Sequence, residues 1–219
     1  MLMKEGDSGK MRSYDNSTRR EAAAVTRRRI LDAATRILLS GGYAGMTVAR
    51  LATAADVSPQ TVYNAIGGKA QVVKAVYDTL LAGDEDPIPM SERPGFLAMR
   101  DSADPKAFFE AYAAWSRGIY ARVGPLLGVL LEGGSGGDAA LREFVATIEA
   151  ERRTGNGHAL ELLRRSHGIP RSPGRAALHD AVWTLTSPEV ADRLIRRCGW
   201  SARRYESWLA RQLLRSYEG

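Results

Sequence analysis

The stretch TVARLATAADVSPQTVYNAIGGK, residues 47–69, decides the fold of this 219-residue chain. It holds two short helical patterns separated by a corner, and each pattern starts at a residue whose hydroxyl can cap a helix, Thr47 and Ser58. Pro59 then occupies the first helical position of the second pattern, where no backbone donor is lost. Asp56 lies in the corner, where a tight turn needs a residue that tolerates a left-handed backbone. The stretch therefore predicts two short helices joined by a tight turn.

An apolar pair accompanies each of the two caps. Met46 with Leu51, and Val57 with Val62, place apolar side chains immediately before the cap and four residues after it, which fixes how the chain enters each helix. Such a hairpin is typical of a helix-turn-helix that reads DNA. Caps and apolar spacing by themselves are equally compatible with an ordinary helical hairpin, so the surroundings have to decide.

The segment before the hairpin reads as an amphipathic helix with a basic start. Arginines fill positions 27–29, and Gly41 with Gly42 gives an ordinary signal for the end of a helix. The apolar side has the spacing of a stripe that faces a core and consists of Ile30, Ala33, Ala34, Ile37 and Leu38. Three helices are therefore expected at this end of the chain.

Charge is distributed unevenly between the two parts of the sequence. Residues 1–80 hold 12 Lys and Arg against 7 Asp and Glu, whereas residues 81–219 hold 19 against 18. Because proteins are attracted to duplex DNA first through its phosphates, a basic head next to a nearly neutral body indicates a DNA-binding protein.

Residues 28–81 resemble the N-terminal domain of the tetracycline-repressor (TetR) family of bacterial transcriptional regulators. The shared features follow in the same order: Gly-Gly-Tyr at residues 41–43, a helix start at Thr47, Val-Ser at residues 57–58, Thr-Val-Tyr at residues 61–63, and Lys69 opening a fourth helix. The similarity continues in residues 89–96, 183–189 and 199–209, which resemble one common type of C-terminal regulatory domain in that family. The resemblance implies an operator-binding homodimer.

The residues expected to contact DNA lie mainly at the start of the second hairpin helix, because the N-terminal part of such a helix points into the major groove. Gln60 and Asn64 carry amides that can pair with base edges, adenine above all. The resemblance assigns phosphate contacts to Thr47, Tyr63 and Lys69. The complete predicted set is Arg28, Thr47, Ser58, Gln60, Thr61, Tyr63, Asn64 and Lys69.

A helix of about 17 residues is expected to begin at Asp104-Pro105 and to carry an unusual number of aromatic side chains. Large rigid rings gathered on one helix are suited to line a cavity for an apolar or aromatic small molecule. The predicted pocket residues are Phe108, Tyr112, Trp115 and Tyr120, with His179 and Trp183 as further walls. For each aromatic residue taken singly, a place in the structural core is the stronger alternative.

The C-terminal third contains further helix signals and a predicted dimer surface. Glycines around residues 133–137 form a connector, a long helix runs from about residue 138 to 166, and Ser-Pro pairs at 172–173 and 187–188 and a serine at 201 start the next helices. A self-complementary bundle of two copies is expected, because helix-turn-helix proteins commonly read two half-sites as pairs. The predicted interface consists of Leu178, Val182, Leu185, Trp208, Leu209 and Leu213.

These patterns predict an all-α fold: an N-terminal three-helix domain with a helix-turn-helix, followed by a larger helical domain for ligand binding and dimerisation. The expected domains are a mobile basic arm at residues 1–20, the DNA-binding domain at 21–68 and the regulatory domain at 69–219, whose residues 69–83 form a connecting helix. Cys198 is the single cysteine, and neither a signal peptide nor a membrane-spanning run is apparent. A cytoplasmic protein without cofactor, metal or membrane partner is expected.

Two other functions compete with that of a ligand-responsive regulator. An enzyme is disfavoured, because His158, His167 and His179 match no metal-binding spacing and no nucleophile motif is present. An architectural or phage-type DNA-binding protein without a ligand ranks higher, yet it would not need a body of some 130 residues with an aromatic-rich helix.

Overall fold

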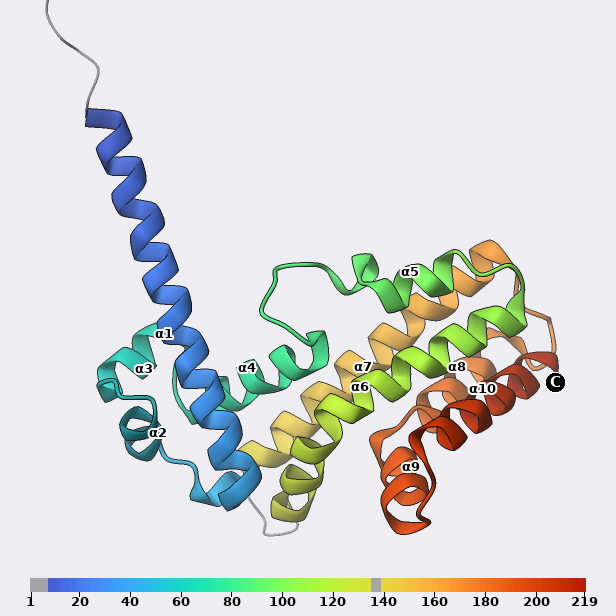
Figure 1. Cartoon of the computed structure of the whole chain (residues 1–219). Coiled ribbons are helices and arrows are strands. Elements are labelled where there is room, and N and C mark those ends of the chain that lie inside the picture. Colours follow the sequence, from blue (N-terminus) through green and yellow to red (C-terminus); the bar gives the residue numbers. More distant parts are fainter. Residues whose placement is uncertain (1–7, 135–138) are drawn as a thin grey trace, which may run out of the picture. The chain divides into compact units, whose positions relative to one another are not determined.

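The computed structural model describes residues 8–134 and 139–219, and every regular element in these ranges is helical (Figure 1). The predicted all-α class is confirmed. The chain forms two compact units that divide between Val76 and Tyr77. This division falls inside helix α4 (Lys69–Ala82), which was expected to connect the two domains.

The first unit contains α1 (Ser8–Gly45), α2 (Val48–Ala54), α3 (Pro59–Ala65) and the start of α4. Because α1 begins at Ser8, residues 8–20 are helical, whereas the sequence placed them in an arm without helical period; residues 1–7 lie outside the described part. The predicted helix end is confirmed at Gly42, whose φ of 68° interrupts the helical backbone. A positive φ is readily adopted by glycine, which has no Cβ.

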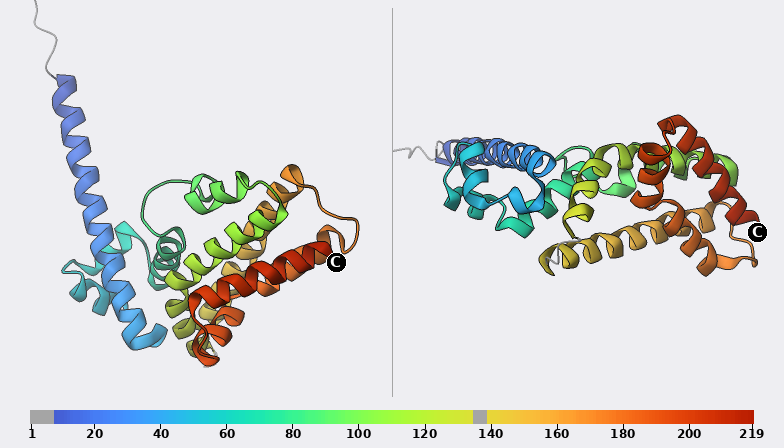
Figure 2. Two further views of the ribbon diagram at one scale, coloured as in Figure 1. Left: turned by 45° about the vertical axis from the view of Figure 1, so that its right-hand side comes forward. Right: turned by 90° about the horizontal axis from the view of Figure 1, so that it is seen from below.

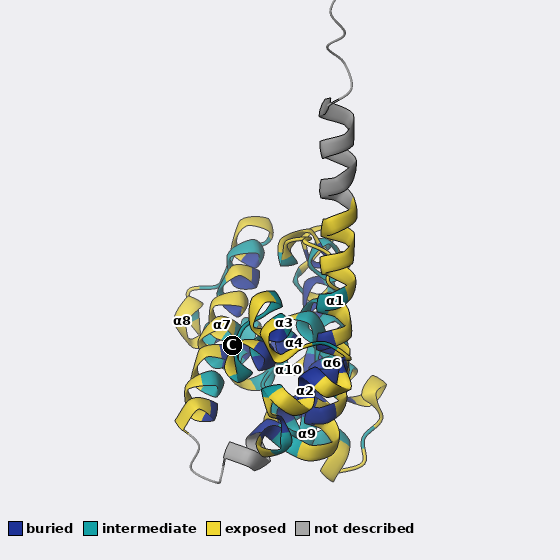
Figure 3. Ribbon diagram, turned by 90° about the vertical axis from the view of Figure 1, so that its left-hand side faces the viewer, coloured by how far each residue is buried: buried dark blue, intermediate teal, exposed yellow. Residues whose placement is uncertain are grey.

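The core of this unit is the predicted apolar stripe packed against the hairpin (Figure 3). Ile30 and Leu38 from α1, Met46 before α2, Leu51 in α2 and Val62 in α3 are each no more than 1% exposed. Asp56 has the predicted left-handed backbone, with a φ of 51°. The hairpin is therefore held by a shared core and not by its turn alone.

The second unit is a bundle built around α6 (Pro105–Gly134), against which α10 (Ala202–Glu218) and α5 (Pro94–Arg100) pack (Figure 2). The remaining helices are α7 (Ala139–Ser166), α8 (Gly174–Leu185) and α9 (Pro188–Asp192); a short 3-10 turn, Met90–Glu92, precedes α5, and a π-helical turn, Arg193–Arg197, follows α9.

Helix α6 is much longer than the predicted 17 residues, because it continues through Pro125. A proline inside a helix removes one hydrogen bond, but packing of the flanking turns can offset that loss. The predicted glycine connector falls partly on the last turn of α6 and otherwise outside the described residues.

Most predicted helix starts are confirmed by a side-chain cap. Asp104 accepts a hydrogen bond from the amide of Ala107 at 2.7 Å, and Ser187 and Ser201 accept equivalent bonds at 3.3 and 3.2 Å. Ser172 is the exception: α8 begins at Gly174, Pro173 holds the N-cap position, and no side chain caps the helix.

Most residues of the predicted dimer surface are buried within their own chain. Four of the six side chains are completely buried in the core of their own chain, with a relative exposure of 0%: Leu178, Val182, Leu209 and Leu213. The helical spacing does mark an apolar face on each helix, but α8 packs against α10 and α7, and α10 packs against α6. Only Leu185 and Trp208 remain half-buried at the edge of this core.

Candidate nucleic-acid interface and ligand cavity

The N-terminal end of α3 is ordered by Ser58 and presents polar side chains to solvent. The Ser58 hydroxyl oxygen accepts a hydrogen bond from the backbone amide of Thr61 at 3.0 Å and lies 2.8 Å from the Thr61 hydroxyl. Val62 points into the core, whereas Tyr63 on the next position is 52% exposed. This helix therefore buries one face and leaves its other face open for a partner.

The two amides predicted to read bases lie next to each other on the open face. Gln60 donates from Nε2 to Oδ1 of Asn64 at 2.9 Å, and both residues are exposed. Residues four positions apart share one side of a helix, so the pair acts as a unit. The bond orients both amides before a partner arrives, and each amide keeps donor and acceptor capacity for a base edge.

Two residues predicted to contact phosphate flank this helix in the sequence. Thr47 caps α2, because its hydroxyl oxygen accepts from the amide of Arg50 at 3.2 Å, and its side chain is exposed. The Lys69 ammonium lies over the ring of Tyr43, 3.8 Å from the centroid. This cation–π contact places a positive charge at the start of α4, where the amides of the first turn are also available to an anion.

The basic triplet at residues 27–29 divides into two roles. Arg29 donates to the carbonyl of Ala55 at 2.8 Å and pairs with the Asp56 carboxylate at 3.1 Å, so it fastens α1 to the corner of the hairpin. Arg27 donates to the carbonyl of Ala65 at the end of α3, at 3.2 Å. Arg28 is exposed and remains the DNA-contact candidate of the three. Sequence reasoning treated the triplet as charge only and missed the two tethers.

The second unit contains a cavity of about 660 Å³ between α4, α6 and α7. Three predicted pocket residues line it, all from α6: Tyr112, Trp115 and Tyr120. Its volume lies within the range that small-molecule sites occupy. The walls are mostly apolar and also include Leu81, Met90, Ile119, Val123 and Leu127.

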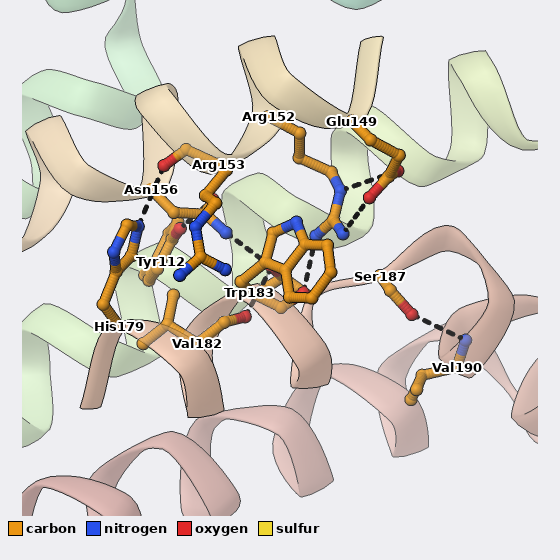
Figure 4. Close-up of polar contacts among 11 residues, drawn as sticks. Tyr112, Glu149, Arg152, Arg153, Asn156, His179, Val182, Trp183, Ser187 and Val190 are labelled. Carbon is orange, nitrogen blue, oxygen red and sulfur yellow. Dashed lines mark hydrogen bonds and ion pairs between the residues drawn. The ribbon is translucent and has the colours of Figure 1, made fainter. Parts of the chain in front are cut away.

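Three other predicted pocket residues do not line this cavity. Phe108 is fully buried in the core, where its ring meets those of Phe109 and Tyr112. His179 and Trp183 lie on α8 and face α7 from outside the cavity (Figure 4). A ring nitrogen of His179 lies 2.9 Å from the carbonyl oxygen of Arg153.

Trp183 is enclosed by two arginines of α7. The guanidinium carbons of Arg152 and Arg153 lie 5.2 and 5.1 Å from its ring, and Arg152 also donates to its carbonyl oxygen at 2.6 Å (Figure 4). Arg152 is fixed in turn by Glu149, which accepts at 2.7 and 3.1 Å. These contacts join α7 to α8 and make Trp183 a packing residue.

Two glycines make room for the aromatic walls. A Cβ on Gly95 of α5 would lie 2.7 Å from Cγ of Trp115, and one on Gly124 would lie 2.7 Å from Cε2 of Tyr120. Real Cβ atoms do not approach so closely, so both rings depend on the missing side chains for their positions. Neither glycine carried a signal in the sequence that connected it to the cavity.

The polar groups of the cavity were also missed. Asn156 of α7 is only 7% exposed and accepts a hydrogen bond from the Tyr112 hydroxyl at 2.8 Å. Tyr77 of α4 lines the cavity as well, and burial raises its pKa to about 12, as burial also does for Tyr120. Both phenols are therefore neutral hydrogen-bonding groups at ordinary pH.

Within the part of the chain that the structure describes, no group of three or more His, Cys, Asp or Glu side chains is placed to hold a metal ion. No described helix is both long and apolar enough to cross a membrane.

An exposed, capped reading helix in a three-helix basic unit, followed by a helical unit with a cavity, defines a DNA-binding transcriptional regulator of the helix-turn-helix class. Residues 30–76 match the family model of bacterial regulatory proteins, tetR family. The DNA-binding unit is therefore that of a TetR-family transcriptional regulator.

Solved structures share this fold across most of the chain. MexZ, a repressor responsible for antibiotic resistance in Pseudomonas aeruginosa, is 20% identical with a TM-score of 0.55, over 87% of this chain and 94% of its own. A TetR-family transcriptional regulator from Mesorhizobium loti is 15% identical with a TM-score of 0.55, over 89% of this chain and 96% of its own. A Clostridium perfringens protein named for fatty acid metabolism regulation is 15% identical with a TM-score of 0.54, over 86% of this chain and 97% of its own. At these identities the likeness concerns the fold alone. No curated protein matches the sequence.

Proposed function

We propose that this protein represses transcription as a homodimer on a palindromic operator and is released by a small apolar or aromatic effector. The observation that carries the proposal is the cavity, because Tyr77 and Leu81 in its wall belong to α4, the helix that begins at Lys69 directly after the reading helix. A molecule in the cavity contacts the helix that leads to the DNA-binding unit.

Coupling would follow from a shift between two populations. One population has the two DNA-binding units of the dimer spaced for the operator, and the other does not. A ligand that prefers the second population lowers operator affinity by its differential affinity for the two, typically about 1 to 3 kcal/mol. A palindromic operator presents two half-sites whose centres lie roughly 34 to 36 Å apart, one turn of DNA. Each half-site needs its own DNA-binding unit, so the proposal requires two copies of the chain. The proposed interface does not include Leu209 and Leu213, because both side chains are buried in their own chain.

The test begins with operator selection from random duplex DNA. Enriched sequences with an inverted repeat support a two-fold dimer, and sedimentation at micromolar concentration gives the oligomeric state independently. Small-molecule pools are then screened for a rise in thermal midpoint, since a ligand of the folded state raises it. Each stabilising compound is finally titrated against the operator complex.

The proposal predicts that a stabilising compound releases the operator at the concentrations at which it fills the protein. Three results contradict it: enrichment of no sequence above the random background, a monomer in sedimentation, or compounds that fill the cavity without changing operator affinity. The last result would favour the alternative of a DNA-binding protein that has no effector.

A further inference from the structure

One wall of the cavity contains a chain of three neutral hydrogen-bonding side chains on three successive helical segments. Tyr112 of α6 donates to Oδ1 of Asn156 of α7 at 2.8 Å, and Nδ2 of Asn156 donates to Oγ1 of Thr186, after α8, at 3.3 Å. All three residues line the cavity. Asn156 is also one of only two buried polar or charged residues among those described.

The direction of this chain is fixed at its far end. The Thr186 hydroxyl donates to the carbonyl oxygen of Val182 at 2.7 Å, so its oxygen can only accept from Asn156. The amide of Asn156 must then turn Nδ2 toward Thr186 and Oδ1 toward Tyr112. A primary amide has two N–H donors, and this arrangement uses one of them. Asn156 keeps one donor in a cavity wall, and the oxygens of the chain keep acceptor capacity.

The charged groups of the cavity are placed differently. Glu151 is solvent-exposed on α7, on the same side as the exposed lining residues Thr154 and His158. Arg152 is directed to Glu149 and to the carbonyl of Trp183. Arg152 is close enough to Tyr112 to act on it electrostatically, but its charge is already paired with the Glu149 carboxylate, so the wall around Asn156 offers no available counter-charge. A charged ligand group placed there would lose its hydration without a partner, at a large cost in free energy.

We propose that the cavity selects a ring-bearing ligand with a neutral oxygen head, a hydroxyl or carbonyl, which accepts a hydrogen bond from Asn156 Nδ2 while the ring packs against Trp115. This inference rests on the proposed function for the cavity and adds the chemical class of its ligand. Asn156 is the residue that determines specificity. Tyr112 and Thr186 position its amide.

The test uses four naphthalene probes that share one ring system and differ in the head. They are 2-naphthalenemethanol, 2-methylnaphthalene, 2-naphthoate and 2-naphthylmethylammonium, and their binding to the full chain is measured by equilibrium dialysis. The alcohol is expected to bind at least about tenfold more tightly than either charged probe, because burial of an unpaired charge is unfavourable. Tighter binding of the naphthoate or the ammonium probe than of the alcohol overturns the inference.

Substitution of Asn156 separates the hydrogen bond from the fit of the ring. Asn156→Leu should reduce the affinity ratio of the alcohol to 2-methylnaphthalene by roughly threefold to tenfold, and leave the methyl probe bound. The double variant Tyr112→Phe with Asn156→Leu removes both polar partners and should fold if the single variant does not. Thr154→Val is the matched control, since it deletes a lining hydroxyl on the exposed side and should leave the ratio unchanged.

The outcomes distinguish this inference from the proposed function. An unchanged ratio in the folded Asn156 variants overturns the assignment of the head to Asn156 and leaves the cavity as a ligand site. Failure of all four probes to bind overturns the cavity itself and with it the inference. Binding in the expected order without operator release supports the ligand class and contradicts the regulatory coupling.

Discussion

Arg122 of α6 is joined to Leu80 near the C-terminal end of α4 by a hydrogen bond of 2.9 Å from Nε to the carbonyl oxygen. Its Nη2 donates in addition to the carbonyl of Leu81 at 3.0 Å. The last carbonyls of a helix have no partner within the helix, and a cation there also interacts favourably with the helix dipole. Since Val123 beside Arg122 and Leu81 of α4 both line the cavity, this pair joins two helices of the cavity wall, α6 and α4.

Arg122→Met should weaken communication between cavity and operator. Loss of two charge-assisted bonds is expected to lower the free energy of unfolding by about 1 to 3 kcal/mol, and the effector should release operator less completely. Thermal unfolding and operator titration with and without effector measure the two effects. Arg203→Met on the exposed start of α10 is the control. An Arg122 variant with an unchanged effector response would remove this pair from the communication route.

Gln60→Ala should relax the sequence preference of the protein at a cost of roughly 1 to 3 kcal/mol on the correct site. In this variant Asn64 also loses its hydrogen-bond partner. The loss of binding free energy in the double variant Gln60→Ala with Asn64→Ala should therefore be smaller than the sum of the two single losses. Competition titrations over point-substituted operators give these values. Gln71→Ala, an exposed glutamine on α4, serves as the control.

Lys69→Ala should weaken binding to all sites alike, because a phosphate contact carries no sequence information. The variant should also show a flatter dependence of affinity on salt, since fewer counterions are released. Titrations at several salt concentrations on the operator and on random DNA measure both quantities. A selective loss on the operator alone would place Lys69 among the base-reading residues instead.

Leu209→Glu is expected to unfold the second unit and not to yield a folded monomer. Leu209 is fully buried, and a carboxylate at that position would be desolvated without a partner. The milder Leu209→Ala should cost about 2 to 5 kcal/mol. Circular dichroism melts decide between unfolding and dissociation. A folded, monomeric Leu209→Glu protein would instead return this residue to the dimer interface.

Gly95→Ala should displace Trp115 from the cavity wall, because the new Cβ occupies the space of the indole ring. We expect a changed tryptophan emission spectrum and weaker binding of any ligand that packs on this ring. Gly155→Ala is a matched control, since Gly155 also lines the cavity but a Cβ there meets nothing within 4 Å. Equal effects of the two substitutions would contradict the proposed role of Gly95.

Stability should fall in the alkaline range as buried tyrosines ionise. Burial raises the pKa of Tyr77 and Tyr120 from the ordinary 10.0 to about 12. A group with a raised folded pKa contributes stability that is complete below its unfolded pKa, here about 10, and is lost as pH rises through the folded value. Ultraviolet titration of the tyrosines should therefore show that a fraction of them ionises only as the pH approaches about 12.

The helices of the first unit could be predicted closely from sequence, because each has a local signal. Ser58 and Thr47 cap helices as expected, and Asp56 has the expected backbone. Such signals act over three or four residues, and tertiary packing does not override them here. The length of α6 was underestimated, because no local signal shows that a helix continues through Pro125; the added turns are held by tertiary packing, since Val123, Leu126 and Leu130 are buried.

The cavity was predicted only in part, for a different reason. Rings on α6 could be recognised as a group, but helical spacing does not tell whether a face meets another helix or an open volume. Phe108 therefore went to the core while Trp115 lined the cavity. Asn156 had no signal of its own, because a single polar residue on a long helix ordinarily points to solvent. The apolar faces of α8 and α10 were assigned to a second copy for the same reason.

The exposed lining residues of α7 have a consequence for how fast the regulator responds. Thr147, Ala150 and Thr154 line the cavity and are exposed, so a ligand can reach its site along this side without separation of the helices. Association then need not wait for a rare opening of the fold, and affinity differences among effectors should be expressed mainly as differences in residence time. Under the proposed function, a fall in effector concentration would restore operator binding within the time that one effector molecule stays bound.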